Sequence, residues 1–111
     1  MAIPIADGDI RRGFVNASSS GDNEIVAAQG AGIKIRVISM LAIAGNAANT
    51  MTLRSGTTAI SAGFPLAANG GFAANENSYG WFSTDANAAL NINLSGATLV
   101  AVSITYILTT V

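Results

Sequence analysis

Short stretches in which apolar and polar side chains alternate recur along the chain, and clusters of Gly, Asn, Ser and Asp separate them. In the clearest stretch, Leu90, Ile92 and Leu94 alternate with two Asn residues and a Ser. Alternation at every second residue is typical of a β-strand with one buried face, and helical spacing is nearly absent. The number of stretches between turn signals predicts an all-β fold, an antiparallel β-sandwich of about eight strands that is jelly-roll-like.

Two longer stretches, 33–44 and 99–109, are rich in β-branched residues and are predicted to be central strands. In the second, one apolar face is predicted to carry Val100, Val102, Ile104, Tyr106 and Leu108. In the first, one apolar face is predicted to carry Ile33, Ile35, Val37, Leu41 and Ile43. Because its other face begins with Lys34 and Arg36 and then becomes apolar, we expect this strand to end buried on both sides.

Turn residues divide the strands. Asn69-Gly70-Gly71 is the strongest turn signal, because Asn and Gly accept the positive φ that tight turns need. Ser55-Gly56 predicts a tight hairpin between a strand that ends at Arg54 and the segment 57–61. The Ala-rich segment 86–89 is flanked by Asp and Asn and is predicted to be a loop and not a helix.

The 111 residues suit one domain, which we expect to span 10–111 after an N-terminal arm at 1–9. Pro4 lacks the N–H that a central strand donates, so the first residues make a poor interior strand. Ile3 and Ile5 would share one side of an extended arm. We therefore expect the arm to bind a neighbouring subunit through these two side chains.

The chain contains no His and no Cys. This composition excludes Ser-His-Asp and Cys-His nucleophiles, imidazole acid/base chemistry, and zinc sites built from thiolate or imidazole. We therefore expect no enzymatic activity and no cofactor. Asp7 and Asp9 alone offer too few oxygen ligands for calcium, so no metal is expected. Arg11 and Arg12 follow them and are expected to contact a neighbouring subunit or these same acids.

Charged residues make up 10% of the chain, against about 25% in typical soluble domains. A surface with so little charge favours burial against other subunits, so a homo-oligomer, most simply a homotrimer, is expected. The net charge of −1 argues against nucleic acid as a partner. The apolar run 37–44 is far shorter than a membrane span and the first residues lack a signal peptide pattern, so no membrane partner is expected.

Tyr79, Trp81 and Phe82 form a short aromatic group. Alternation places Tyr79 and Trp81 on one face and Phe82 on the other. Aromatic side chains of this kind are core residues or interface anchors, and Trp81 is a candidate for the latter. The alternative is that the pair stacks on a sugar ring.

The segments GTTAISAGFPLAANGGF (56–72), GWF (80–82) and ALNINLSGA (89–97) together resemble small β-sandwich proteins encoded in structural gene modules of tailed bacteriophages. The resemblance covers about residues 30–108. It implies a virion protein made in the host cytoplasm, often a capsid cement (decoration) protein that sits as a trimer over junctions between major capsid protein subunits. The alternatives are a tail or head-fibre component that binds glycans through loop aromatics, and a carbohydrate-binding module, which the missing secretion signal and single Trp disfavour.

Overall fold

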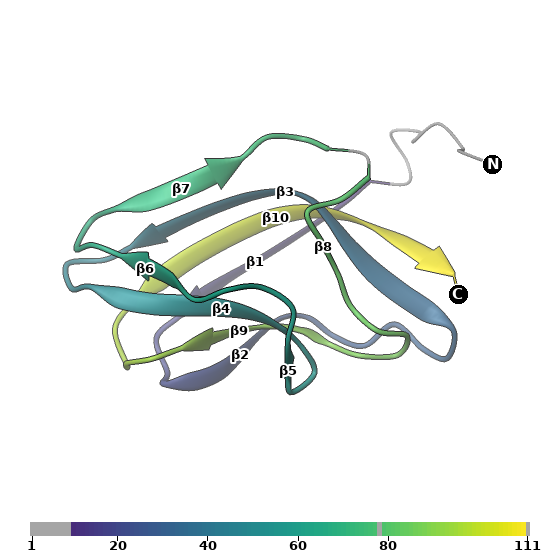
Figure 1. The fold of residues 1–111 in the computed structure, drawn as a ribbon, viewed down its shortest axis with the longest axis horizontal. Helices are drawn as coiled ribbons and strands as arrows, with labels where there is room; N and C mark the ends of the chain where they lie inside the picture. The colour runs from purple at the N-terminus through teal and green to yellow at the C-terminus, as the bar shows by residue number, and fades with distance from the viewer. Residues whose placement is uncertain (1–9, 78, 111) are drawn as a thin grey trace.

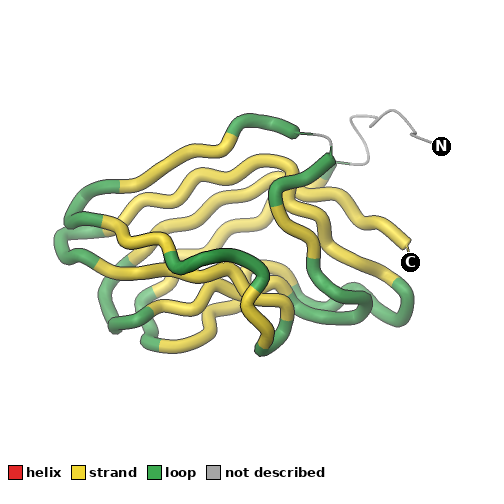
Figure 2. The backbone as a smooth tube through the Cα atoms, viewed as in Figure 1, coloured by secondary structure: helices red, strands yellow, loops and turns green. Residues whose placement is uncertain are grey.

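The computed structural model describes residues 10–77 and 79–110, and this part of the chain folds into β-strands without a helix (Figures 1 and 2). The strands are β1 (Arg11–Ala17), β2 (Gly21–Val26), β3 (Ile33–Ala44), β4 (Asn49–Ser55), β5 (Thr58–Ala59), β6 (Phe64–Leu66), β7 (Gly71–Ala74), β8 (Phe82–Ser83), β9 (Leu90–Leu94) and β10 (Val100–Thr110).

The strands form two antiparallel sheets that pack face to face. Sheet A has the order β1-β10-β3-β7, with β8 also paired to β3, and sheet B has the order β2-β9-β4-β5, with β6 also paired to β4. Early and late strands therefore lie side by side in both sheets, as in the two Greek keys of a jelly roll. The predicted eight strands become ten because two positions, beside β3 and beside β4, are each shared by two short strands.

The core lies between the inner faces of the sheets. Leu90, Ile92 and Leu94 of β9 are almost completely buried, as their alternation with polar residues predicts. On β10 the predicted apolar face is confirmed, with Val100, Val102, Ile104 and Tyr106 buried and Leu108 packed against the same cluster. These side chains supply the main apolar burial that holds the sheets together.

The strand β3 differs from the prediction at one residue. Tyr106 of β10 lies opposite Val37, but Thr105 lies opposite Ser39, so Ile38 is an extra residue in a β-bulge. A one-residue insertion reverses which side chains face the core. Met40, Ala42 and Ala44 therefore face inward and are buried, whereas Leu41 and Ile43 face outward and are 46% and 45% exposed. The predictions that Leu41 and Ile43 continue the buried face of Ile35 and Val37, and that this strand ends buried on both sides, are wrong.

Asn49 fixes the loop between β9 and β10 from inside the sandwich. Its side-chain amide donates to the carbonyl oxygens of Gly96 and Thr98, at 2.9 and 3.0 Å. Its side-chain oxygen accepts from the hydroxyl of Ser95 and from the N–H of Gly96. This buried polar side chain is therefore fully hydrogen-bonded, which offsets the cost of removing it from water.

The predicted turns are present. Asn69 has a φ of 59°, and a side chain at Gly71 would collide with the carbonyl oxygen of Ala42, so both positions suit their residues. This turn joins β6 of sheet B to β7 of sheet A and does not close a hairpin. Ser55-Gly56 closes the predicted hairpin, although β5 is shorter than the predicted 57–61. Residues 86–89 form a loop, as predicted.

The opposite environments of Ile92 and Leu41 provide a test of the fold. We expect Ile92→Ala to lower the free energy of unfolding by about 2–5 kcal/mol, because it leaves a cavity in the core. Leu41→Ala removes a similar aliphatic side chain from an exposed position and should change stability by no more than about 0.5 kcal/mol. Urea unfolding followed by circular dichroism measures both, and equal losses would contradict the assigned faces.

Candidate docking surface

The outer face of sheet A carries rows of side chains that cross four strands. One row runs from Phe14 on β1 through Ser103 and Leu41 to Ala73 on β7. The next row consists of Asn16, Ala101, Ile43 and Gly71. Neither row contains a charged residue, and both contain large apolar side chains at outward positions. We call these two rows the sheet A face.

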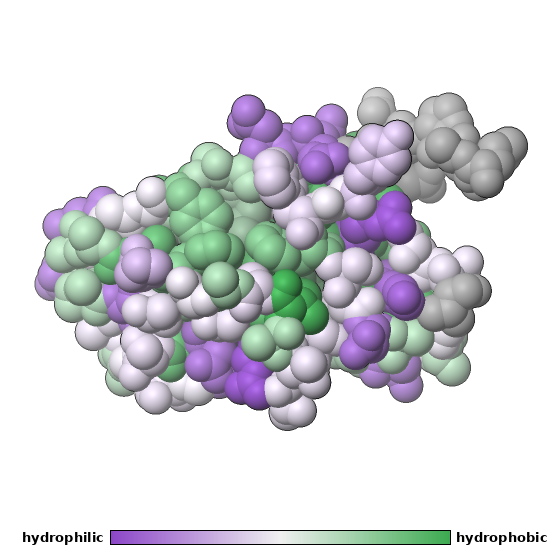
Figure 3. Space-filling view, viewed as in Figure 1, coloured by the Kyte–Doolittle hydropathy of each residue, from purple (hydrophilic) through white to green (hydrophobic). Residues whose placement is uncertain are grey.

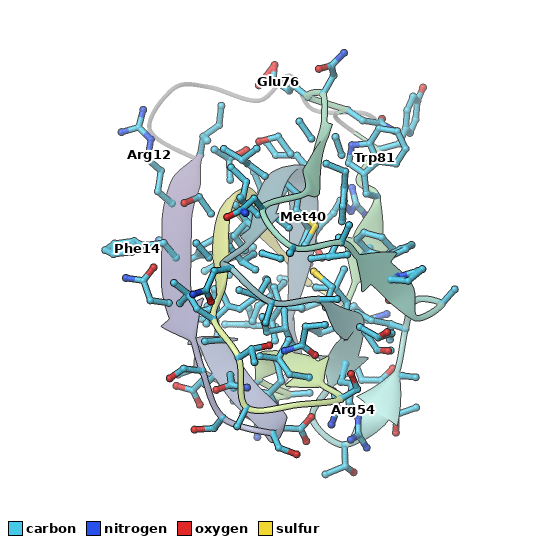
Figure 4. The ribbon with its side chains drawn as sticks, turned by 90° about the vertical axis from the view of Figure 1, so that its left-hand side faces the viewer. Arg12, Phe14, Met40, Arg54, Glu76 and Trp81 are labelled. Atoms are coloured by element: carbon cyan, nitrogen blue, oxygen red, sulfur yellow. The ribbon has the colours of Figure 1, made fainter. Side chains whose placement is uncertain are left out.

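The large side chains of the sheet A face are open to solvent in the isolated chain. Phe14 is 73% exposed, and it points away from the body of the molecule (Figure 4). Between Phe14 and Leu41 the surface is hollowed into a depression of about 320 Å³, which Ser103, Thr105 and Arg12 also line. Contiguous exposed apolar surface of this kind marks protein interaction sites.

The outer face of sheet B has the opposite character. Asp22, Asn93 and Thr52 form one row across it, and Glu24, Asn91 and Arg54 form the next. Arg54 forms an ion pair with Asp22 at 3.3 Å, and Asn93 donates to the same carboxylate at 3.0 Å. This face carries charges, and Arg54 and Asp22 satisfy each other locally, which suits contact with water. Of these two surfaces, the sheet A face is thus the more apolar one.

The predicted interface residues are only partly brought together. Arg11 and Arg12 are exposed on β1, and Arg12 lies at the rim of the depression, in register with Thr105 and Ser39. Among the described residues no carboxylate lies within 4 Å of Arg12. The predicted arm at 1–9, with Ile3, Ile5, Asp7 and Asp9, lies outside the described residues.

Trp81 lies on the far side of the molecule from Arg12 and Phe14 (Figure 4). Its backbone N–H donates to Val37 of β3, and its indole N–H donates to the carbonyl oxygen of Asn75 at 2.7 Å. The indole is therefore held in one orientation while 47% of the residue stays exposed. Tyr79 is 87% exposed, and Phe82 packs against the core, in agreement with the predicted opposite faces.

A third apolar feature closes the open side of the sandwich, between β6 and the strands β7 and β8. The ring of Phe64 lies edge-on to that of Phe72 at 5.3 Å and is tilted against that of Phe82 at 6.4 Å. All three rings are half-buried. Figure 3 shows apolar surface over β6 and β7 on this side.

No helix of the described residues is long and apolar enough to cross a membrane, and no three acidic side chains among them gather into a metal-binding group. The comparisons with known proteins gave no match: no family model, no curated protein and no solved structure matches the chain.

Sequence reasoning missed Phe14, Leu41 and Ile43 as surface residues. The available signal was the second half of β3, in which both faces are apolar. A sandwich covers only one face of each sheet, so a strand that is apolar on both faces has one face left for a partner.

Charge substitutions on the two outer faces test this assignment. Leu41→Lys places a charge in the middle of the sheet A face, whereas Thr52→Lys places one on the polar face of sheet B. We expect Leu41→Lys to elute much earlier than the unmodified protein from a hydrophobic-interaction column, and Thr52→Lys to shift little. Equal shifts for the two variants would show that the sheet A face is not the main apolar surface in solution.

Proposed function

We propose that the protein is a structural virion protein, a capsid cement (decoration) protein that docks the sheet A face on the shell of major capsid protein. The contrast between the uncharged sheet A face and the charged face of sheet B, where Asp22 and Arg54 form an ion pair, carries this proposal. A partner for such a face is itself flat and largely uncharged. A shell of repeated protein subunits offers that surface many times.

The energetics suit a protein that binds in many copies. Complete burial of one Leu, Ile or Phe contributes about 1.5–3 kcal/mol, so the exposed parts of Phe14, Leu41 and Ile43 offer roughly 1 kcal/mol or more each. One such contact is modest after the costs of association. When copies are linked in an oligomer, further contacts form at high effective concentration and occupancy rises steeply.

The fold and the composition support the same function without establishing it. Jelly rolls are common in viral capsid proteins and lectins, although a fold alone does not define a function. The chain has no His and no Cys, and the proposed role requires no catalysis and no cofactor. The resemblance of residues 56–72, 80–82 and 89–97 to phage structural proteins points to the outside of the capsid as the location.

The stoichiometry in particles tests the proposal. We expect quantitative mass spectrometry of purified particles of the encoding phage to find a fixed, high ratio of this protein to the major capsid protein. The protein should remain with heads after tails are removed. When added to heads that lack it, Leu41→Lys should bind at least tenfold more weakly than Thr52→Lys. Absence from heads, or equal binding of the two variants, would contradict the proposal.

The protein is proposed to act as a homotrimer, because few charges keep copies apart. Light scattering at micromolar concentration should give about three times the monomer mass of 11.2 kDa. A mass of one monomer that does not rise with concentration would exclude self-association at these concentrations.

A second candidate function rests on the fixed, half-exposed indole of Trp81 and the exposed ring of Tyr79. Such a pair can stack on sugar rings, as expected of a glycan-binding tail or head-fibre component. Trp81 is the only Trp of the chain, so its fluorescence reports directly on this site. Saturable quenching or a shift in emission on adding host-envelope polysaccharide, lost in Tyr79→Ala, would favour this function over the cement role.

A further inference from the structure

The four edges of the two sheets are not equally protected against pairing with another chain. Exposed edge strands are usually blocked by charges, by Pro or by being very short. Strand β1 carries Arg11 and Arg12, and β2 carries Asp22 and Glu24. At the other edge of sheet B, β5 has two residues, and β6 has three residues including Pro65.

Strand β7 has neither a charge nor a Pro, and with four residues it is longer than β5, β6 and β8. Its sequence is Gly-Phe-Ala-Ala, with no charge and no Pro, and it ends the strand order of sheet A. In Figure 1 it lies along the upper edge of the molecule, with no described element above it. It is thus the most open site for strand addition among the described residues.

The register of β7 shows which backbone groups are available. The N–H of Ala44 donates to the carbonyl oxygen of Gly70 at 2.7 Å, so residue 70 and its alternates 72 and 74 direct their backbone groups toward β3. The intervening residues Gly71 and Ala73 direct theirs toward the open edge. To pair with them, an added strand needs two residues, spaced two apart, that each have a backbone N–H and a carbonyl group.

We propose that residues 2–5 of a second copy of this chain pair with β7 as an added strand. This segment, Ala-Ile-Pro-Ile, is uncharged and has the same length as β7. Pro4 has no N–H, and a Pro disfavours the helical conformation of the residue before it. In an edge strand Pro is accepted only where its missing N–H faces solvent, which leaves Ile3 and Ile5 to pair with β7.

The side chains fit this antiparallel register, with Ile3 opposite Ala73 and Ile5 opposite Gly71. Side chains of paired residues lie on the same face, so both Ile side chains would extend the sheet A face beside small residues. Pro4 would lie opposite Phe72, over the half-buried rings that line the open side. Each row of the sheet A face then continues onto the neighbouring copy.

The position of β1 favours a second copy over the same copy as the donor of this strand. Residue 10 precedes β1, which lies at the opposite edge of sheet A from β7, three strand spacings or about 14 Å away. Pairing within one copy would lead the segment with Asp7 and Asp9 across the outer face of sheet A, and desolvating carboxylates is costly. Donation from one copy to the next is a head-to-tail contact, which closes into a ring in a trimer.

Disulfide cross-linking tests the proposal on the purified full chain, which has no Cys of its own. In the proposed register, Ile3→Cys and Ala73→Cys form a hydrogen-bonded pair with Cα atoms about 5.5 Å apart, which a disulfide can bridge. The two single variants are mixed in a glutathione buffer, so that a link between them can form only between copies. The expected product is a heterodimer, identified by its mass, that forms at least tenfold more than from Ile3→Cys mixed with Thr52→Cys.

An independent variant, Ala73→Pro, removes an N–H that β3 does not use. We expect it to keep the β-sheet circular dichroism and to lose the oligomer in light scattering. No excess of heterodimer over the Thr52→Cys control, or an unchanged oligomer in Ala73→Pro, would overturn the proposal. A disulfide that forms only within one chain of the Ile3→Cys, Ala73→Cys double variant would overturn it as well.

The inference rests on the self-association proposed above and does not depend on capsid binding. An intact oligomer without the cross-link refutes the strand addition alone. A cross-linked oligomer that fails to bind heads refutes the cement function alone.

Discussion

The β-bulge at Ile38 determines which side chains the longest strand offers to the core and which to a partner. Before the bulge, Ile35 and Val37 face inward, and after it Met40 and Ala42 do so, because the inserted residue reverses the alternation. The same insertion turns Leu41 and Ile43 outward, where they join Phe14 in a surface that crosses sheet A. A local irregularity of the backbone therefore creates the feature on which the proposed function rests.

The outer faces of the two sheets differ in the charged side chains that they carry. On sheet B, Asp22 is a common acceptor for Arg54 and Asn93, so the charges of Asp22 and Arg54 offset each other. An exposed pair of this kind adds little to stability, and its main effect is a hydrated face that resists association. Sheet A has no such network, and its outward Leu, Ile and Phe side chains gain from burial against another subunit. The direction of docking that we propose follows from this difference.

Local patterns in the sequence were enough to predict the all-β class, the inward faces of β9 and β10 and the turn at Asn69, since each depends on neighbouring residues. The bulge was beyond reach, because both Val37 and Ile38 are apolar and either could continue the alternation. Arg12 and Trp81 were predicted as interface residues from residue type and local position, and only the structure shows that they lie on opposite sides. Phe14 was missed because its row forms through pairing with β10, which is 89 positions away at Ser103.

The unprotected edge at β7 and the uncharged sheet A face are parts of one surface. Gly71 and Ala73 end the two rows with the smallest side chains, which leaves both the edge and the face open for another chain. A side chain at Gly71 would collide with the backbone of Ala42, so the close approach of β7 to β3 requires Gly at this end of the row. A strand added at β7 would supply the bulky apolar side chains that the rows lack at this end. Self-association would thereby widen the same face that we propose to dock on the capsid, which couples assembly of the oligomer to the area available for binding.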